Sequence, residues 1–272
     1  MNRIDATFAA LRKRKQAAFM PFITAGDPSF EVTRDLVVEL ARNGADLIEF
    51  GIPFSDPIAD GPVIQASYTR ALAHGATLEQ CLRTVREIRR LSAIPIVFMI
   101  SYTLVFRHGL EGFIKSAQEA GVDGAIIPDL PIEEGEAAAK AGRARGFDIV
   151  FLIAPTTPPE RRRRIAEMSQ GFIYCVSVAG ITGARDRLPD YMADYIASIK
   201  GLTDKPVCLG FGVSTPEQAR FVAAHADGVI VGSAIVREME KASALPPREQ
   251  VARVAAFAQR LAAATKQVEG TR

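Results

Sequence analysis

Short apolar segments alternate with amphipathic helical segments along most of this chain, and this alternation is the feature that most constrains its fold. Eight segments are apolar at successive positions, which is typical of parallel strands buried on both faces. They cover residues 17–24, 46–50, 94–100, 124–127, 147–153, 172–177, 206–209 and 228–231. The sequence therefore predicts a parallel sheet covered by helices.

Helical spacing of apolar residues separates these strands. The first expected helix is marked by Ile4, Phe8 and Leu11. The others cover residues 30–43, 62–73, 78–91, 109–120, 132–145, 159–168, 191–200, 216–225 and 248–264. Eight strand-helix units favour a single α/β domain over residues 1–272, a closed (β/α)8 or TIM barrel, with extra helices at the N-terminus and after the second strand. An open doubly wound sheet is the alternative, but no Gly-x-Gly-x-x-Gly follows the first strand.

Composition excludes several classes of protein. A formal net charge of +2 gives no reason to expect nucleic acid as a partner. No apolar run approaches the ~18 residues of a membrane span, and the N-terminus has no signal-peptide pattern, so we expect a cytoplasmic protein with no membrane contact. Cys81, Cys175 and Cys208 are far apart in sequence, which argues against a disulfide framework or a zinc site.

Residues 46–61 form a short apolar strand that runs into an acidic loop rich in Pro and Gly. Alternation along the strand places Ile48 and Phe50 on one face and Leu47 and Glu49 on the other, where a buried parallel strand normally carries aliphatic residues. Burying an unpaired carboxylate costs several kcal/mol. Because active sites of such barrels lie at the C-terminal ends of the strands, we expect Glu49 and Asp60 to share one cleft. A structural ion pair of Glu49 is the alternative.

Two glycine-rich turns follow the seventh and eighth strands, at residues 210–214 and 232–234. Glycine lets the backbone approach an anion closely, and N–H groups at the start of a helix point toward it. Loops seven and eight commonly bind phosphate in this fold, so the pair predicts a phosphorylated substrate. The loop at residues 179–189 is longer than a turn requires, and we interpret it as a lid, with a plain surface loop as the alternative.

Several blocks of this chain resemble those of the tryptophan synthase alpha subunit family, nearly from end to end. The main block is residues 47–62; others are residues 21–28, 128–131, 154–157, 174–183, 210–212 and 232–234. The resemblance implies a lyase that splits indole-3-glycerol phosphate into indole and glyceraldehyde 3-phosphate. It also implies that Glu49 is the general acid/base and that Asp60 interacts with the indole nitrogen. The implied substrate-binding residues are Phe22, Tyr174, Thr182, Gly183, Phe211, Gly212, Gly232 and Ser233.

The family also pairs this subunit with a beta subunit that uses pyridoxal phosphate, in an alpha2-beta2 heterotetramer. The resemblance therefore implies no metal or organic cofactor in this chain. It places four residues of the acidic loop at the partner interface: Pro53, Phe54, Asp56 and Pro57. We expect Pro53, Phe54 and Asp56 to be exposed. Two positions depart from the family pattern, with Thr103 where Asn is usual and Val178 where some members carry Arg.

The sequence alone leaves three other hypotheses about the function open. Another phosphosugar-handling barrel, such as an isomerase, would share the glycine turns but would not explain the block from Glu49 to Asp60. A stand-alone lyase would release indole freely. A non-catalytic barrel would only activate a beta subunit, although the presence of both acids argues against a decayed site.

Overall fold

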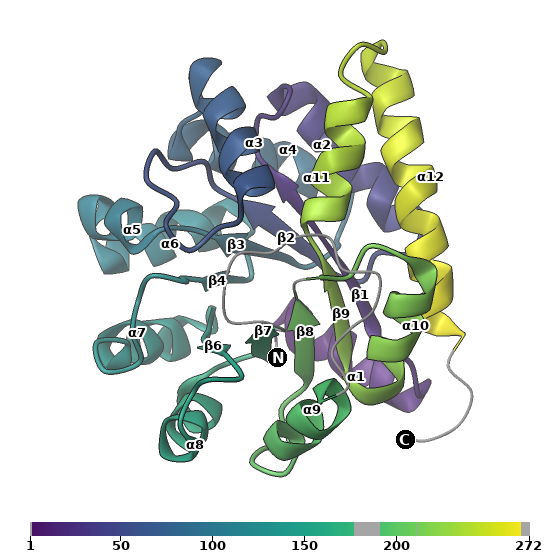
Figure 1. The fold of residues 1–272 in the computed structure, drawn as a ribbon. Coiled ribbons are helices and arrows are strands. Elements are labelled where there is room, and N and C mark those ends of the chain that lie inside the picture. Colours follow the sequence, from purple (N-terminus) through teal and green to yellow (C-terminus); the bar gives the residue numbers. More distant parts are fainter. Residues whose placement is uncertain (1, 177–190, 211, 268–272) are drawn as a thin grey trace.

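A nine-stranded parallel sheet forms the centre of the protein (Figure 1). The computed structural model describes residues 2–176, 191–210 and 212–267. The strands are β1 (Ala18–Thr24), β2 (Ile48–Gly51), β3 (Ile96–Met99), β4 (Gly124–Ile126), β5 (Asp148–Val150), β6 (Leu152–Ile153), β7 (Ile173–Val176), β8 (Val207–Gly210) and β9 (Gly228–Val231). Their order in the sheet is β5-β4-β3-β2-β1-β9-β8-β7-β6.

The two ends of this order, β5 and β6, are neighbours in the chain, separated only by Phe151. Asp148–Val150 pairs with β4, whereas Leu152–Ile153 pairs with β7. One stretch of chain therefore joins both edges and closes the sheet into a barrel. The predicted (β/α)8 fold is confirmed, and β5 and β6 together are its fifth strand.

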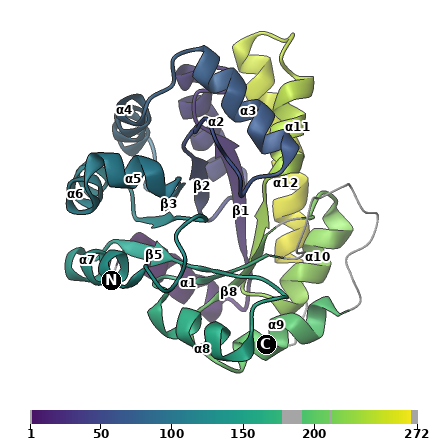
Figure 2. The ribbon, with the colours of Figure 1, turned by 60° about the vertical axis from the view of Figure 1, so that its left-hand side comes forward.

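Helices surround the barrel (Figures 1 and 2). They are α1 (Arg3–Lys13), α2 (Phe30–Arg42), α3 (Pro62–Ala73), α4 (Leu78–Arg89), α5 (Tyr102–His108), α6 (Leu110–Ala120), α7 (Glu136–Arg145), α8 (Pro159–Met168), α9 (Met192–Lys200), α10 (Pro216–His225), α11 (Ser233–Lys241) and α12 (Pro247–Lys266). The extra helices expected at the N-terminus and after the second strand are α1 and the pair α3 and α4.

Three details of the helix prediction were wrong. Helix α5, whose first turn is capped by the Ser101 hydroxyl, was not predicted. Helix α11, which buries Ala234, Ile235, Val236 and Met239, was not predicted either. Helix α7 begins four residues later than expected, because residues 132–135 form turns.

Two apolar clusters lie on the two sides of the sheet. The larger one packs between the strands and the surrounding helices and contains Ile48 and Phe50. The smaller one fills the barrel and contains Leu47, as the alternation predicts. Helix α1 closes the N-terminal end of the barrel, where Phe8 lies 5.8 Å from Phe172 between ring centroids. A functional site can therefore lie only at the opposite end of the barrel, at the C-terminal ends of the strands.

Candidate active site

Glu49 is the second residue of β2 and lies on its inner face. Its neighbours in the sheet register are Phe22 on β1 and Val97 on β3. The side chain is 1% exposed, and its oxygens make no hydrogen bond of ordinary geometry to the described residues. Burial, and then the nearby charge of Asp60, raises the pKa of Glu49 to about 8, while the Tyr174 hydroxyl opposes the rise. The carboxyl is therefore mainly protonated at neutral pH.

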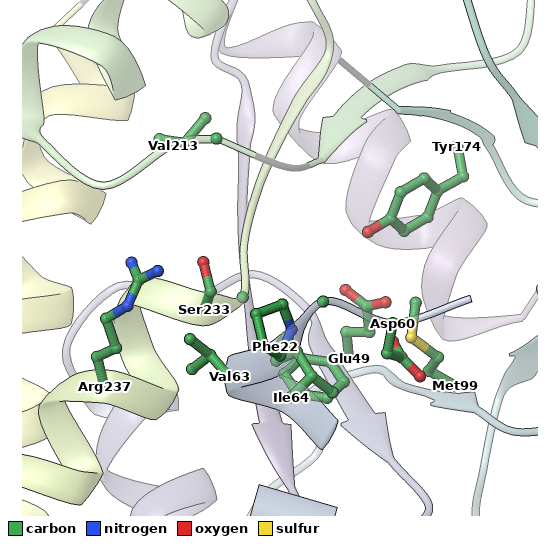
Figure 3. Close-up of a pocket in the computed structure, with 14 residues that line it drawn as sticks. Phe22, Glu49, Asp60, Val63, Ile64, Met99, Tyr174, Val213, Ser233 and Arg237 are labelled. Atoms are coloured by element: carbon green, nitrogen blue, oxygen red, sulfur yellow. The ribbon is translucent and has the colours of Figure 1, made fainter. Parts of the chain in front are cut away.

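Asp60 lies at the end of the loop between β2 and α3 and lines the same pocket as Glu49 (Figure 3). Gln65 holds this loop, because its side-chain amide donates to the Asp60 carbonyl at 2.8 Å. Burial, and then the charge of Asp129, raises the pKa of Asp60 to about 6. Asp129 itself accepts hydrogen bonds from the Ser101 hydroxyl and the Tyr102 amide. At neutral pH the pocket thus holds one mainly neutral and one mainly ionised carboxyl group.

Tyr174, on β7, directs its hydroxyl into the pocket toward Glu49 (Figure 3). Burial and the two carboxyl groups raise the pKa of Tyr174 well above its usual 10, so the phenol keeps its proton. Phe22, on β1, also lines the pocket (Figure 3). Glycine is required beside it, because a Cβ atom on Gly51 would collide with the Phe22 ring.

The other end of the pocket is lined by the two glycine turns. Gly212 has φ +84°, a left-handed conformation that favours glycine. Gly232 and Ser233 lie where β9 turns into α11, so the first N–H groups of this nine-residue helix are at the pocket. Arg237, one helical turn further along α11, also lines this end (Figure 3).

The pocket is therefore polarised along its length. Its acidic end holds Glu49 and Asp60, its basic end holds helix N–H groups and a guanidinium, and the apolar side chains of Phe22, Ile64 and Met99 line it as well. The arrangement suits proton transfer at one end of a ligand and binding of an anionic group at the other.

The structure brings together seven of the ten predicted catalytic and substrate-binding residues. They are Phe22, Glu49, Asp60, Tyr174, Gly212, Gly232 and Ser233. Thr182, Gly183 and Phe211 lie outside the described residues, as do Val178 and the whole predicted lid. Sequence reasoning missed Arg237. The available signal was its spacing of four residues from Ser233, which puts both on one helix face.

The loop after β2 partly contradicts the predicted exposure of its partner-facing residues. Asp56 is exposed, and Phe54 and Pro57 are half-buried, but Pro53 is buried. Its burial follows from the backbone, because the preceding Ile52 amide still donates to the Met99 carbonyl at 2.9 Å and continues the path of β2. Ile58, which was not predicted, is 87% exposed. Phe54, Asp56, Pro57 and Ile58 line a smaller pocket beside Asp60.

Two further observations concern metals and membranes. Across the described residues, His, Cys, Asp and Glu side chains form no cluster of three or more that could hold a metal ion. None of the described helices combines the length and apolar character needed to cross a bilayer.

The fold and the pocket place this chain among the (β/α)8-barrel enzymes, which carry out their chemistry at the C-terminal ends of the strands. Comparison with known proteins narrows that class. Residues 8–266 match the family model for the tryptophan synthase alpha chain. The chain belongs to this family, and it is a lyase of the alpha reaction in tryptophan biosynthesis.

Individual relatives support this assignment over nearly the full length. The tryptophan synthase alpha chain of Gloeobacter violaceus is 46% identical over 266 residues, covering 97% of this chain and 95% of that protein. That of Geotalea daltonii is 50% identical over 244 residues, covering 89% and 92%. The crystal structure of tryptophan synthase subunit alpha from Legionella pneumophila superimposes with a TM-score of 0.89 at 37% identity, covering 97% of this chain and 98% of that one.

Proposed function

We propose that this chain cleaves indole-3-glycerol phosphate to indole and glyceraldehyde 3-phosphate, with Glu49 as general acid and base and Asp60 as the stabilising anion. The observation that carries the proposal is the pair of carboxyl groups in one pocket with pKa values of about 8 and about 6. This difference gives the two groups opposite protonation states at neutral pH.

The reaction needs two proton transfers. A protonated Glu49 delivers its proton to C3 of the indole ring, which produces a cationic indolenine. The resulting carboxylate then takes the proton from the glycerol hydroxyl beside the breaking carbon–carbon bond, and Glu49 returns to its protonated form. Ionised Asp60 beside the ring nitrogen stabilises the cation between these steps. Tyr174 supports Glu49, since its hydroxyl favours the ionised form of the carboxyl.

At the other end of the pocket, the substrate phosphate binds to the N–H groups of the glycine turns. Gly212 and Gly232 permit close approach, and Ser233 begins the helix that points at the anion. We propose that this chain needs no metal or organic cofactor of its own.

The partner is a pyridoxal phosphate-dependent beta subunit, which joins this chain in an alpha2-beta2 heterotetramer. The loop after β2 suits this contact, because Asp56 and Ile58 are exposed close to Asp60 in the chain. Co-elution of the two subunits in size-exclusion chromatography, with a raised rate of indole release, tests this part.

The decisive experiment measures indole release from indole-3-glycerol phosphate by the purified chain. Glu49→Gln should lower kcat by about 10²- to 10⁴-fold, and Asp60→Asn by about 10²- to 10³-fold. Glu119→Gln is the matched control, because this carboxylate lies on the surface of α6, and it should keep parent activity. A Glu49→Gln variant with near-parent kcat would overturn the assignment.

A further inference from the structure

Arg237 is a cation in the pocket that the reaction scheme above does not use. It is half-buried on α11 and lines the pocket at the end opposite the two acids (Figure 3). Ser233 is four residues earlier on the same helix, so the hydroxyl and the guanidinium share one face of α11. Among the described residues that line this pocket, Arg237 is the one with a positively charged side chain.

The charge of Arg237 is not neutralised by the described part of the protein. Nearby acids on α11 are paired with other cations: Glu238 with Lys241 at 3.4 Å and Arg253 at 2.8 Å, and Glu240 with Arg70 at 3.2 Å. In the described chain, the Arg237 guanidinium has no ion pair or hydrogen bond. A half-buried guanidinium with no partner among the described residues is available to a ligand anion.

We propose that Arg237 pairs with the phosphate of the substrate and selects a charged ligand over a neutral one. The inference rests on the proposed function and extends it, because the backbone N–H groups of the glycine turns supply only partial charges. A guanidinium adds a full charge and a planar pair of donors that matches phosphate oxygens.

The same residue also fixes the orientation of the substrate. A phosphate placed at the acidic end would lie beside Asp60, where like charges repel. At the basic end it meets Arg237. The indole ring, which carries no charge, is then left beside Glu49 and Asp60.

The test compares Arg237→Gln, Arg237→Lys and Lys241→Gln. Lys241→Gln removes the same charge from the same helix, but its side chain is 63% exposed and pairs with Glu238 outside the pocket. A charge-assisted hydrogen bond to phosphate corresponds to about 10- to 100-fold in binding. We expect Arg237→Gln to raise KM for indole-3-glycerol phosphate by that factor, with kcat within about threefold of the parent. Arg237→Lys should recover much of the loss, and Lys241→Gln should stay within about twofold.

A second measurement separates this proposal from the proposed function. Calorimetric binding of glycerol 3-phosphate, which carries the phosphate but no indole, should weaken in Arg237→Gln by the same factor, while binding of indole should not change. If the parent releases no indole, the proposed function fails, yet this binding experiment still tests Arg237. Parent-like KM and parent-like glycerol 3-phosphate affinity in Arg237→Gln, or an equal loss in Lys241→Gln, would overturn the inference.

Discussion

Replacing Glu49 with glutamine should stabilise the protein at alkaline pH while it removes activity. Glutamine has nearly the same shape as glutamate but cannot ionise, so it tests the cost of the buried charge directly. In the parent, Glu49 is 1% exposed and its oxygens lack hydrogen bonds of ordinary geometry to the described residues. An ionised carboxylate in such a position loses hydration that the Tyr174 hydroxyl replaces only in part.

The magnitude follows from the pKa of Glu49, which burial raises from the usual 4.5 to about 8. At ~1.4 kcal/mol per pKa unit, this rise corresponds to at most about 5 kcal/mol of folding free energy. Part of it comes from the charge of Asp60, and local relaxation reduces the cost of burial, so we expect a measured effect of about 2–5 kcal/mol.

The pH range of this effect follows from the protonation of Glu49 in the folded and the unfolded protein. Between pH 4.5 and about 8, folded Glu49 keeps a proton that the unfolded chain has released. Its contribution to stability is therefore fully present below pH 4.5 and is lost as the pH rises toward about 8. Glu49→Gln does not titrate at this position, so its advantage over the parent should grow across this window and level off above it.

Urea unfolding at pH 5, 7 and 9, followed by circular dichroism, measures the effect. We expect the difference in free energy of unfolding between Glu49→Gln and the parent to be larger at pH 9 than at pH 5 by the amount given above. Glu119→Gln is the control, since Glu119 forms only a surface pair with Lys115 at 4.0 Å, and it should show no such trend. The same difference at pH 5 and pH 9 would refute the argument from burial.

Three further predictions follow from other parts of the site. Asp129→Asn removes a negative charge that helps to raise the pKa of Asp60 above its usual 3.8. The acidic limb of the plot of kcat/KM against pH should therefore move to lower pH, and an unmoved limb contradicts this prediction. Gly232→Ala should fold, because the added Cβ would lie 3.7 Å from Phe22, an ordinary contact distance. Its KM should nevertheless rise at least about tenfold if a phosphate approaches this backbone, and steady-state kinetics with a thermal melt decide it. Asp56→Ala should weaken activation by a beta subunit and keep the activity of the isolated chain, and equal activation of variant and parent would argue against that interface.

Much of the fold was predictable because strands buried on both faces leave a simple apolar pattern. The closed barrel was also expected from the eight strand-helix units, but the strand pairing that closes it was not predictable. Its fifth strand pairs with β4 through Asp148–Val150 and with β7 through Leu152–Ile153, and a change of partner within one strand leaves no trace in local composition. Helix α5 was missed because seven residues are too few to show helical periodicity. That residues 1–272 form one domain stays a prediction, which a single transition in the urea experiment would support.

The site residues likewise fall into those that a local sequence rule predicts and those whose position depends on the fold. The position of Glu49 followed from alternation, which is a local rule. The placement of Arg237 depends on α11 starting at Ser233, and the burial of Pro53 depends on contacts with a distant strand. Composition suggested an exposed loop at Pro53, because Pro and Gly are frequent in turns, but the backbone there still follows the edge of the barrel.

The alternation also explains why the acid is at position 49 and not at a neighbouring inward position. Two residues earlier, Leu47 is fully buried within the apolar cluster that fills the barrel, where a ligand would have to displace packed side chains. Two residues later, a side chain at Gly51 would collide with Phe22. Glu49 is the inward position of β2 between these limits, deep enough for burial to raise its pKa and still lining the pocket. A carboxylic acid that must stay protonated at neutral pH and still touch a substrate requires both conditions, so the period of two in a β-strand leaves this strand one suitable site.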